Sequence, residues 1–267
     1  MQKQTTHKHT ILLLFLTLSL LFTSCTSPAE TPPPEEEKSI LQITYLDVGQ
    51  GDCTFIQLPN GETMLIDAGN HKDGQSIIQY IQSQDTEVLD YVIATHPHAD
   101  HIGGMAEVIR AFDVKNVYMP KRSHTSETFE NLLDTIAEKN LTIQTAKTGK
   151  VLFDEDHLKA EFLAPVGDSY SNLNNYSAVL KLTYQDKRFL FMGDAEQEVE
   201  NELLESGADL SADVLKVGHH GSDTSSSKGF LEVVHPSFAV ISVGAGNSYG
   251  HPDAVTLTTL QELQAYR

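Results

Sequence analysis

Cysteine and tryptophan are scarce in this chain of 267 residues, which contains two cysteines and no tryptophan. Cys25 closes an apolar segment near the N-terminus, so Cys53 is the only cysteine left for a folded domain. Disulfides within that domain are therefore excluded. Cys53 lies in the alternating segment GDCTFIQL, where a small buried residue is expected rather than a reactive thiol. Stability must come from an apolar core, for which 40% apolar residues are ample.

Basic residues are also few. The chain has 18 lysines and arginines against 37 aspartates and glutamates, which gives a formal net charge of −19. A protein that grips nucleic acid mainly through lysine and arginine would show the opposite balance, because basic residues neutralise the phosphates. Any chemistry on phosphates is therefore expected to depend on metal ions.

Residues 1–24 have the pattern of an export signal, with Lys3 and Lys8 followed by an unbroken apolar run. The box LFTSC resembles the cleavage site of a bacterial lipoprotein, in which Cys25 is the lipidated residue. An ordinary signal peptide or a single transmembrane anchor is the alternative. Residues 25–38 are rich in Pro and Glu and are predicted to form a disordered tether, which leaves residues 39–267 as the folded domain. These features predict an exported protein, lipid-anchored on the outer face of a bacterial membrane.

Strand and helix patterns are mixed along the folded part, without a strict βαβ repeat. This order favours two mixed β-sheets packed between helices. Strands are predicted near 41–48, 53–58, 63–69, 90–95, 115–119, 141–145, 158–163, 178–184, 188–192, 212–217 and 238–243, and helices near 74–83, 105–112, 126–139, 195–206 and 253–266, with one more between the last two strands.

The densest polar group is THPHADH. His96 and His98 alternate on an extended segment and so point the same way, while Asp100 and His101 stand where the next helix begins. Such a turn aims two nitrogen donors at one metal ion and an Asp and a His at a second ion beside it. The alternative is a polar loop whose histidines are satisfied by hydrogen bonds.

Two metal sites need more ligands than this turn supplies. Asp194 ends the apolar strand FLFMGD, where a carboxylate could bridge two ions, and His219 follows the strand VLKVG in the same manner. The alternative for Asp194 is an N-cap of the helix after it.

Seven motifs, in this order, resemble the metallo-β-lactamase-like domain of ComEC-type DNA-uptake competence proteins: LDVGQGD, LIDAG, THPHADHIGG, NNYSAVLKL, FMGDAE, LKVGHHGSDTSS and NSYGHP. The resemblance covers residues 41 to about 255. It implies an α/β fold, an αββα sandwich with a metal site at one edge, and hydrolase activity on phosphodiesters, including nuclease activity. Family members continue beyond the helix after GHP with a Gly-containing strand pair, so the resemblance also implies that this chain is truncated at its C-terminal end.

The resemblance carries roles over to individual residues. Asp67 would orient the metal-binding loop, and His220 is the rival of His219 for the last ligand position. The implied ligands are His96 and His98 for the first metal, Asp100 and His101 for the second, Asp194 as the bridge and His219 as the last histidine.

One departure from the wider superfamily concerns a third histidine for the first metal, which is missing from SNLNNYSAV. Asn175 or Ser177 stands near its place. An amide or hydroxyl oxygen is a harder and weaker donor than imidazole, so the two divalent ions would be zinc or manganese, with manganese favoured at the first site. His124 and His157 lie in other segments and are expected at the surface.

The implied reaction is hydrolysis of a phosphodiester, possible substrates being DNA or nucleotides, by a hydroxide that two metals and Asp100 activate. Ser222 and Thr224 would contact a phosphate oxygen together with Asn175 or Ser177, and His220 and His251 would contact substrate or protonate the leaving group. The alternatives are an acyl hydrolase of the lactonase or β-lactamase type on the same fold, and a non-enzymatic surface binding protein. The chain has no set of apolar spans for a membrane channel, and its acidity leaves small phosphodiesters open beside DNA.

Overall fold

The structure is a computed structural model that describes residues 40–265. The export signal, the lipidation residue Cys25 and the tether predicted for residues 1–38 lie outside the described residues. Within residues 40–265, no helix has both the length and the apolar character needed to cross a membrane.

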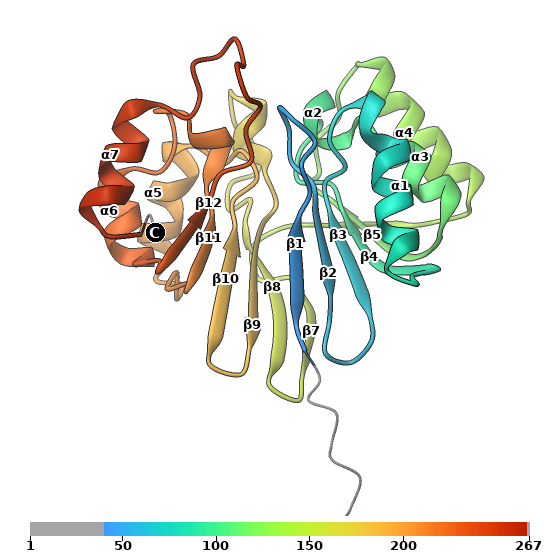
Figure 1. The fold of residues 1–267 in the computed structure, drawn as a ribbon, viewed down its shortest axis with the longest axis horizontal. Helices are drawn as coiled ribbons and strands as arrows, with labels where there is room; N and C mark the ends of the chain where they lie inside the picture. Colours follow the sequence, from blue (N-terminus) through green and yellow to red (C-terminus); the bar gives the residue numbers. More distant parts are fainter. Residues whose placement is uncertain (1–39, 266–267) are drawn as a thin grey trace, which may run out of the picture. The chain divides into compact units, whose positions relative to one another are not determined.

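Two six-stranded mixed sheets face each other (Figure 1). In both sheets neighbouring strands are consecutive in the chain, from β1 to β6 in the first sheet and from β7 to β12 in the second. The strands are β1 (Gln42–Tyr45), β2 (Thr54–Gln57), β3 (Thr63–Ile66), β4 (Val88–Ile93), β5 (Asp113–Met119) and β6 (Ile143–Thr145), then β7 (Val151–Glu155), β8 (Leu158–Ala164), β9 (Val179–Tyr184), β10 (Lys187–Phe191), β11 (Val214–Lys216) and β12 (Phe238–Val240).

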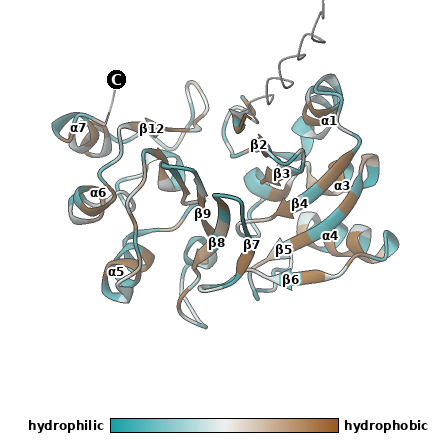
Figure 2. Ribbon diagram, turned by 90° about the horizontal axis from the view of Figure 1, so that it is seen from below, coloured by the Kyte–Doolittle hydropathy of each residue, from teal (hydrophilic) through white to brown (hydrophobic). Residues whose placement is uncertain are grey.

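Helices cover the outer face of each sheet, and the four layers are visible end-on in Figure 2. The predicted αββα sandwich is therefore confirmed. The first sheet carries α1 (Gly74–Ser83), α2 (Ala99–Ile102), α3 (Met105–Ala111) and α4 (Glu127–Glu138); the second carries α5 (Gln197–Ser206), α6 (Lys228–Val234) and α7 (Ala254–Glu262); short 3-10 turns are η1 (His71–Asp73), η2 (Leu173–Tyr176) and η3 (Gly218–Gly221).

Neighbouring residues of one strand point into different apolar layers. Phe55 faces the helices of the first sheet, whereas Ile56 faces the second sheet. In β10, Leu190 faces the helices and Phe191 faces the first sheet. Because side chains alternate along a strand, both faces of each sheet are buried, and the strands must be apolar on both sides.

The strand β7 was not predicted. Its residues VLFDE are half-buried or exposed, and its apolar side chains show no alternation that marks one buried face. It forms because it pairs antiparallel with β8 in a hairpin, a contact that the local pattern does not reveal. The predicted strands and helices are all present. The helix α1 has the predicted ends, and the other elements with predicted bounds differ at one end or both.

The parallel strands of both sheets end at one edge of the sandwich. In the first sheet β3, β4 and β5 run parallel, and in the second β10, β11 and β12 do so. The segments that follow β3, β4, β10 and β11 contain Asp67, the THPHADH turn, Asp194 and the His219–His220 pair. The sheet topology thus gathers motifs from distant parts of the chain.

A buried ion pair links the two sheets beneath this edge. Lys216 of β11 places Nζ 2.8 Å from Oδ2 of Asp52, which precedes β2, and both residues are buried. Burial would raise the pKa of Asp52, but the Lys216 ammonium, with help from His220, holds it below its ordinary value. The backbone N–H of Asp52 also donates to the carbonyl of Asp100, at 3.1 Å.

We predict that Lys216→Met lowers the free energy of unfolding by about 3–5 kcal/mol, because Asp52 is then a buried charge without its partner. Urea-induced unfolding measures the loss. The exposed pair of Lys228 and Glu262 offers the control, and Lys228→Met should cost less than about 1 kcal/mol. Adding Asp52→Asn to Lys216→Met should restore part of the lost free energy of unfolding. The prediction would be contradicted if Lys216→Met cost as little as Lys228→Met.

Candidate metal centre

Asp67, directly after β3, organises the turn that follows β4. Its Oδ1 accepts the backbone N–H of Thr95 at 2.8 Å, and its Oδ2 accepts the Thr95 hydroxyl at 2.7 Å. Oδ2 also lies 2.8 Å from Nδ1 of His101. Asp67 has a φ of 58°, a left-handed conformation that aspartate tolerates better than bulky residues. One buried carboxylate therefore sets the orientation of both the turn and a histidine.

Two glycines allow the turn to sit close to neighbouring backbone. A Cβ on Gly103 would collide with the backbone of Asn70 and His71, and a Cβ on Gly51 would collide with the carbonyl of Asp100. Gly103 of HIGG and Gly51 of LDVGQGD therefore allow two separate close approaches of backbone to α2 and its end. They bring α2, with Asp100 and His101, down onto the ends of the first sheet.

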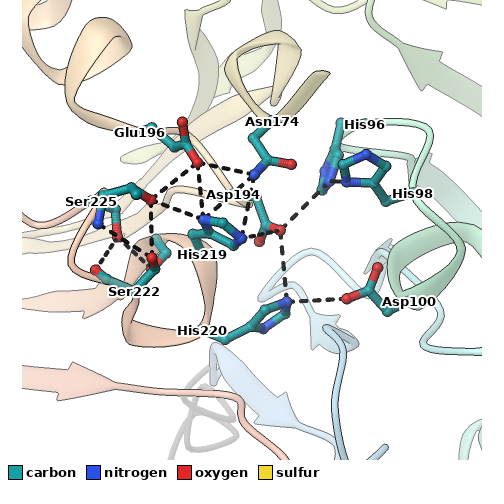
Figure 3. Close-up of polar contacts among 12 residues, drawn as sticks. His96, His98, Asp100, Asn174, Asp194, Glu196, His219, His220, Ser222 and Ser225 are labelled. Carbon is teal, nitrogen blue, oxygen red and sulfur yellow. Dashed lines mark hydrogen bonds and ion pairs between the residues drawn. The ribbon is translucent and has the colours of Figure 1, made fainter. Parts of the chain in front are cut away.

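His96, His98 and Asp194 form the first group of converging ligand atoms. Nε2 of His96 lies 3.0 Å from Nδ1 of His98 and 3.6 Å from Oδ2 of Asp194. The ligand atoms of the three residues lie within 4.8 Å of one another. Figure 3 shows both rings pointing toward the Asp194 carboxylate.

Asp100, His101 and His220 form the second group, with the same limit of 4.8 Å. Nε2 of His220 is 3.3 Å and Nε2 of His101 is 4.0 Å from Oδ2 of Asp100. Asp194 joins the two groups, because its Oδ2 lies 3.2 Å from Nε2 of His101 and 3.7 Å from Nε2 of His220. In Figure 3 this carboxylate is at the centre of the cluster.

His219 lies beside these groups and belongs to neither of them. Its Nε2 is 3.9 Å from Asp194 Oδ2, and its Nδ1 is 3.1 Å from Oε1 of Glu196 and 3.1 Å from the Thr224 hydroxyl. His219 and His220 have φ values of 44° and 52°, so the backbone reverses between strand and loop. This reversal sends the two side chains to different places, and His220 is the one beside Asp100.

Burial sets the protonation of the first group. It holds the pKa of His96 well below its ordinary value, with the nearby ring of His101 acting in the same direction. The pKa of His98 is lowered as well, again mainly by burial. Both rings are therefore neutral near pH 7, the form in which imidazole binds a metal ion.

Carboxylates dominate the second group. Burial alone would lower the pKa of His101, but Asp194 and Asp67 hold it well above its ordinary value. Burial likewise opposes protonation of His220, but Asp194 and Asp100 raise its pKa to about 9. The negative charge of Asp67, Asp100 and Asp194 is thus balanced by protons on His101 and His220. A divalent cation would supply positive charge instead and release those protons.

The unpaired atoms fit a divalent metal. Nε2 of His101 lies 3.2 Å from Oδ2 of Asp194 and Nε2 of His220 lies 3.3 Å from Oδ2 of Asp100, but neither nitrogen makes a hydrogen bond within residues 40–265. Oδ1 of Asp194 is also buried and makes no hydrogen bond within that range. Buried polar atoms that make no hydrogen bond are rare and costly, and three of them converging here fit a site for a cation. Imidazole nitrogen and carboxylate oxygen are the donors that zinc and manganese accept.

Asn174, which was not predicted, lines the cavity of this centre. The predicted Asn175 instead donates to Glu198 Oε2 at 2.7 Å and accepts the Glu196 N–H. Ser177 accepts the N–H of Asp194 at 3.0 Å. Asn174 is adjacent in the NNYS motif, and the turn η2 decides which of the neighbours faces the cavity.

Of the other residues predicted to contact substrate, two lie behind His219 and one lines the cavity. Ser222 and Thr224 bond each other at 3.0 Å, and Thr224 donates to Glu196, behind His219. His251 lines the cavity, as does the exposed Tyr249 beside it. Their substrate roles stay predictions.

The cavity has a volume of about 310 Å³ and opens between the two sheet edges. His124 is half-buried, and its ring centre lies 6.5 Å from that of His98, so it stands beside the centre rather than on a remote surface as expected. Glu196, two residues after Asp194, was also not predicted, although the motif GDAE contains it. The cavity is lined by Gln50, His98, Ala99, Asp100, Asn174, Asp194, His219, His220, Tyr249 and His251.

The model of the metallo-beta-lactamase superfamily matches residues 46–244, which include strands β2 to β12 and all these ligand candidates. The chain belongs to the metallo-beta-lactamase superfamily. This membership confirms the family predicted from the motifs, and the fold supports a metal-dependent hydrolase.

Two curated relatives are similar to most of this metallo-beta-lactamase chain. ComE operon protein 3 of Bacillus subtilis is 31% identical over 82% of the chain and 30% of its own length. Recombination protein 2 of Haemophilus influenzae is 30% identical over 86% of the chain and 27% of its own length. The chain therefore spans less than a third of these relatives.

Among solved structures, CmlA, a diiron β-hydroxylase from Streptomyces venezuelae, is similar to this metallo-beta-lactamase chain with a TM-score of 0.55 and 15% identity. The match covers 87% of this chain and 52% of CmlA. At this identity the likeness concerns the fold alone.

Proposed function

We propose that this metallo-beta-lactamase chain is a metal-dependent phosphodiesterase that acts on nucleic acid or nucleotides. The observation that carries the proposal is the convergence of two ligand groups on the buried Oδ2 of Asp194. Hydrolases that use two metals clamp both the attacking and the leaving oxygen of an in-line displacement, and phosphodiester cleavage is the common reaction of such sites.

His96, His98 and Asp194 would hold one ion, and Asp100, His101 and His220 the other, with Asp194 shared. When bound, two divalent ions would lower the pKa of water and stabilise the charge that develops on phosphoryl oxygens. His220 thus takes the place first expected for His219.

The surrounding residues position these groups and handle protons. Asp67 accepts from Nδ1 of His101 and leaves Nε2 to face the cavity. Glu196 does the same for His219, whose Nε2 lies 3.3 Å from the amide nitrogen of Asn174 and, in the protonated ring, would donate a proton to a leaving oxygen. His251 lines the same cavity and is the second candidate for that proton transfer.

Asn174 would take the role of the absent third histidine. Its Oδ1 is buried and without a hydrogen-bond partner inside the described range. An amide oxygen is a harder donor than imidazole, which favours manganese over zinc at the first site. Nucleic-acid chemistry is supported further by the relative from Haemophilus influenzae, which is named for recombination.

The proposal is tested by incubating the purified protein with manganese or zinc and with bis(p-nitrophenyl) phosphate, single-stranded DNA or a β-lactam. We expect hydrolysis of the phosphodiesters. Asp100→Ala should reduce kcat by at least about 100-fold, since it removes a ligand of the second ion. Asp134→Ala, on the exposed face of α4, serves as the control. Cleavage of the β-lactam alone would establish the acyl-hydrolase alternative instead.

The two histidines of GHHG are expected to differ in metal binding. His220→Ala should remove one of the two ions, as measured by metal analysis after dialysis, because it deletes a ligand nitrogen. His219→Ala should keep both ions and lower kcat. Loss of an ion from the His219 variant, with the His220 variant fully loaded, would reverse the assignment.

We also propose export and lipid anchoring through Cys25, which rest on the sequence pattern of residues 1–25. In a bacterial host the chain should fractionate with membranes, and Cys25→Ser should prevent incorporation of labelled fatty acid. Equal labelling of both proteins would rule out this anchor.

A further inference from the structure

Most lysines and arginines among residues 40–265 are already neutralised by a carboxylate within 4.0 Å. The paired ones are Arg110, Lys115, Lys159, Lys181, Lys187, Arg188, Lys216 and Lys228. In that part of the chain, the cations that form no such pair are Lys72, Lys121, Arg122, Lys139, Lys147 and Lys150. All except Lys72 and Lys139 stand in two turns, after β5 and after β6. Free positive charge is therefore concentrated at one place in an acidic protein.

These two turns border a groove of about 670 Å³, which we name the cationic groove. Lys121 and Lys147 line it, and Asp168 is the one acidic residue among its lining residues. Hydroxyl groups of Thr145 and Thr148 add hydrogen-bonding capacity.

Interactions with neighbouring residues hold Arg122 and the turn that contains Lys147 in place. The guanidinium carbon of Arg122 lies 5.0 Å from the ring centre of Tyr176, which lines the same groove. The turn with Lys147 is held at both ends, because Ala146 donates to the carbonyl of Met119 at 2.9 Å and Thr148 to that of Pro165 at 3.0 Å. Such positioning reduces the entropy lost when an anion binds.

The groove adjoins the metal centre through two segments. Tyr176 and Asn174 belong to the same turn η2, and Asn174 lines the catalytic cavity. On the other side, Arg122 and His124 share the loop before α4, and the ring of His124 is 6.5 Å from that of His98. A chain of phosphates could thus pass from one site to the other.

We infer that the cationic groove binds the backbone of a single nucleic-acid strand whose neighbouring phosphodiester occupies the metal centre. This inference rests on the proposed function and narrows its substrate from any phosphodiester to a strand. The volume is in the range of small-ligand pockets, so a few nucleotides of one strand fit and a duplex does not. Because the rest of the surface repels a polyanion, unpaired cations decide where it binds.

The test combines Lys121→Gln, Arg122→Gln and Lys147→Gln in the full chain. A matched control combines Lys139→Gln, Lys187→Gln and Lys228→Gln, which removes the same charge from exposed positions elsewhere. Binding of a fluorescein-labelled phosphorothioate oligonucleotide is measured by fluorescence polarisation at several salt concentrations. Turnover is measured separately on DNA and on bis(p-nitrophenyl) phosphate.

The groove variant should bind the strand about tenfold more weakly or worse, and its log–log salt dependence should be shallower by about 2, since each single-strand phosphate contact contributes about 0.7. Its kcat/KM on DNA relative to bis(p-nitrophenyl) phosphate should fall about as much as its affinity, while the control keeps the ratio of the wild type.

Equal affinities and equal salt slopes of the two triple variants would overturn the groove assignment, whatever the turnover. Absence of phosphodiester hydrolysis by the wild type would overturn the proposed function. The binding measurements would then still test whether the cationic groove binds a nucleic-acid strand. The two failures are therefore distinguishable.

Discussion

The buried charge of Asp194 is the constraint on which the centre depends. Asp194 is 2% exposed, and burying an uncompensated charge costs several kcal/mol. Compensation comes from both sheets, because the protonated His101 follows β4 and the protonated His220 follows β11. The buried charge of Asp194 is therefore stabilised only when the segments that follow β4 and β11 lie together at this edge of the two sheets.

Support for this arrangement extends outward in two directions. Asp67 fixes His101 from the side of the first sheet, and Lys216 fixes Asp52 across the interface. Asp52 in turn faces His220, whose Nδ1 is 3.4 Å from its Oδ1. The ion pairs form a connected network, and such networks are strong only when every member has its partner. Within residues 40–265, Nε2 of His101, Nε2 of His220 and Oδ1 of Asp194 make no hydrogen bond. These atoms at the centre of the network are therefore the ones that a metal would bind.

If the chain acts on a phosphodiester as proposed, electrostatics would place catalysis and substrate capture at different sites. The centre is rich in carboxylates and would repel phosphate unless metal ions are bound. The cationic groove is lined by Lys121 and Lys147 and bordered by Arg122 over the ring of Tyr176, so it is positive without help from metals. An acidic protein can act on a polyanion when such a groove attracts the phosphates. Metal ions would then neutralise the charge at the phosphodiester that is cleaved.

The sequence by itself determined the sandwich and the identity of most residues in the centre. Adjacent apolar residues, as in TFIQ and TMLI, are typical of strands buried on both faces, and THPHADH concentrates metal-binding donors within one short segment. The strand β7 escaped prediction because its pairing with β8 is what stabilises it.

Only the tertiary structure decided between adjacent residues. His219 and His220 differ by one position, as do Asn174 and Asn175, and spacing cannot tell which one faces the centre. The left-handed backbone of η3 and the tight turn η2 make that choice. The cationic groove was invisible for the same reason, since net charge does not reveal which cations lack a partner.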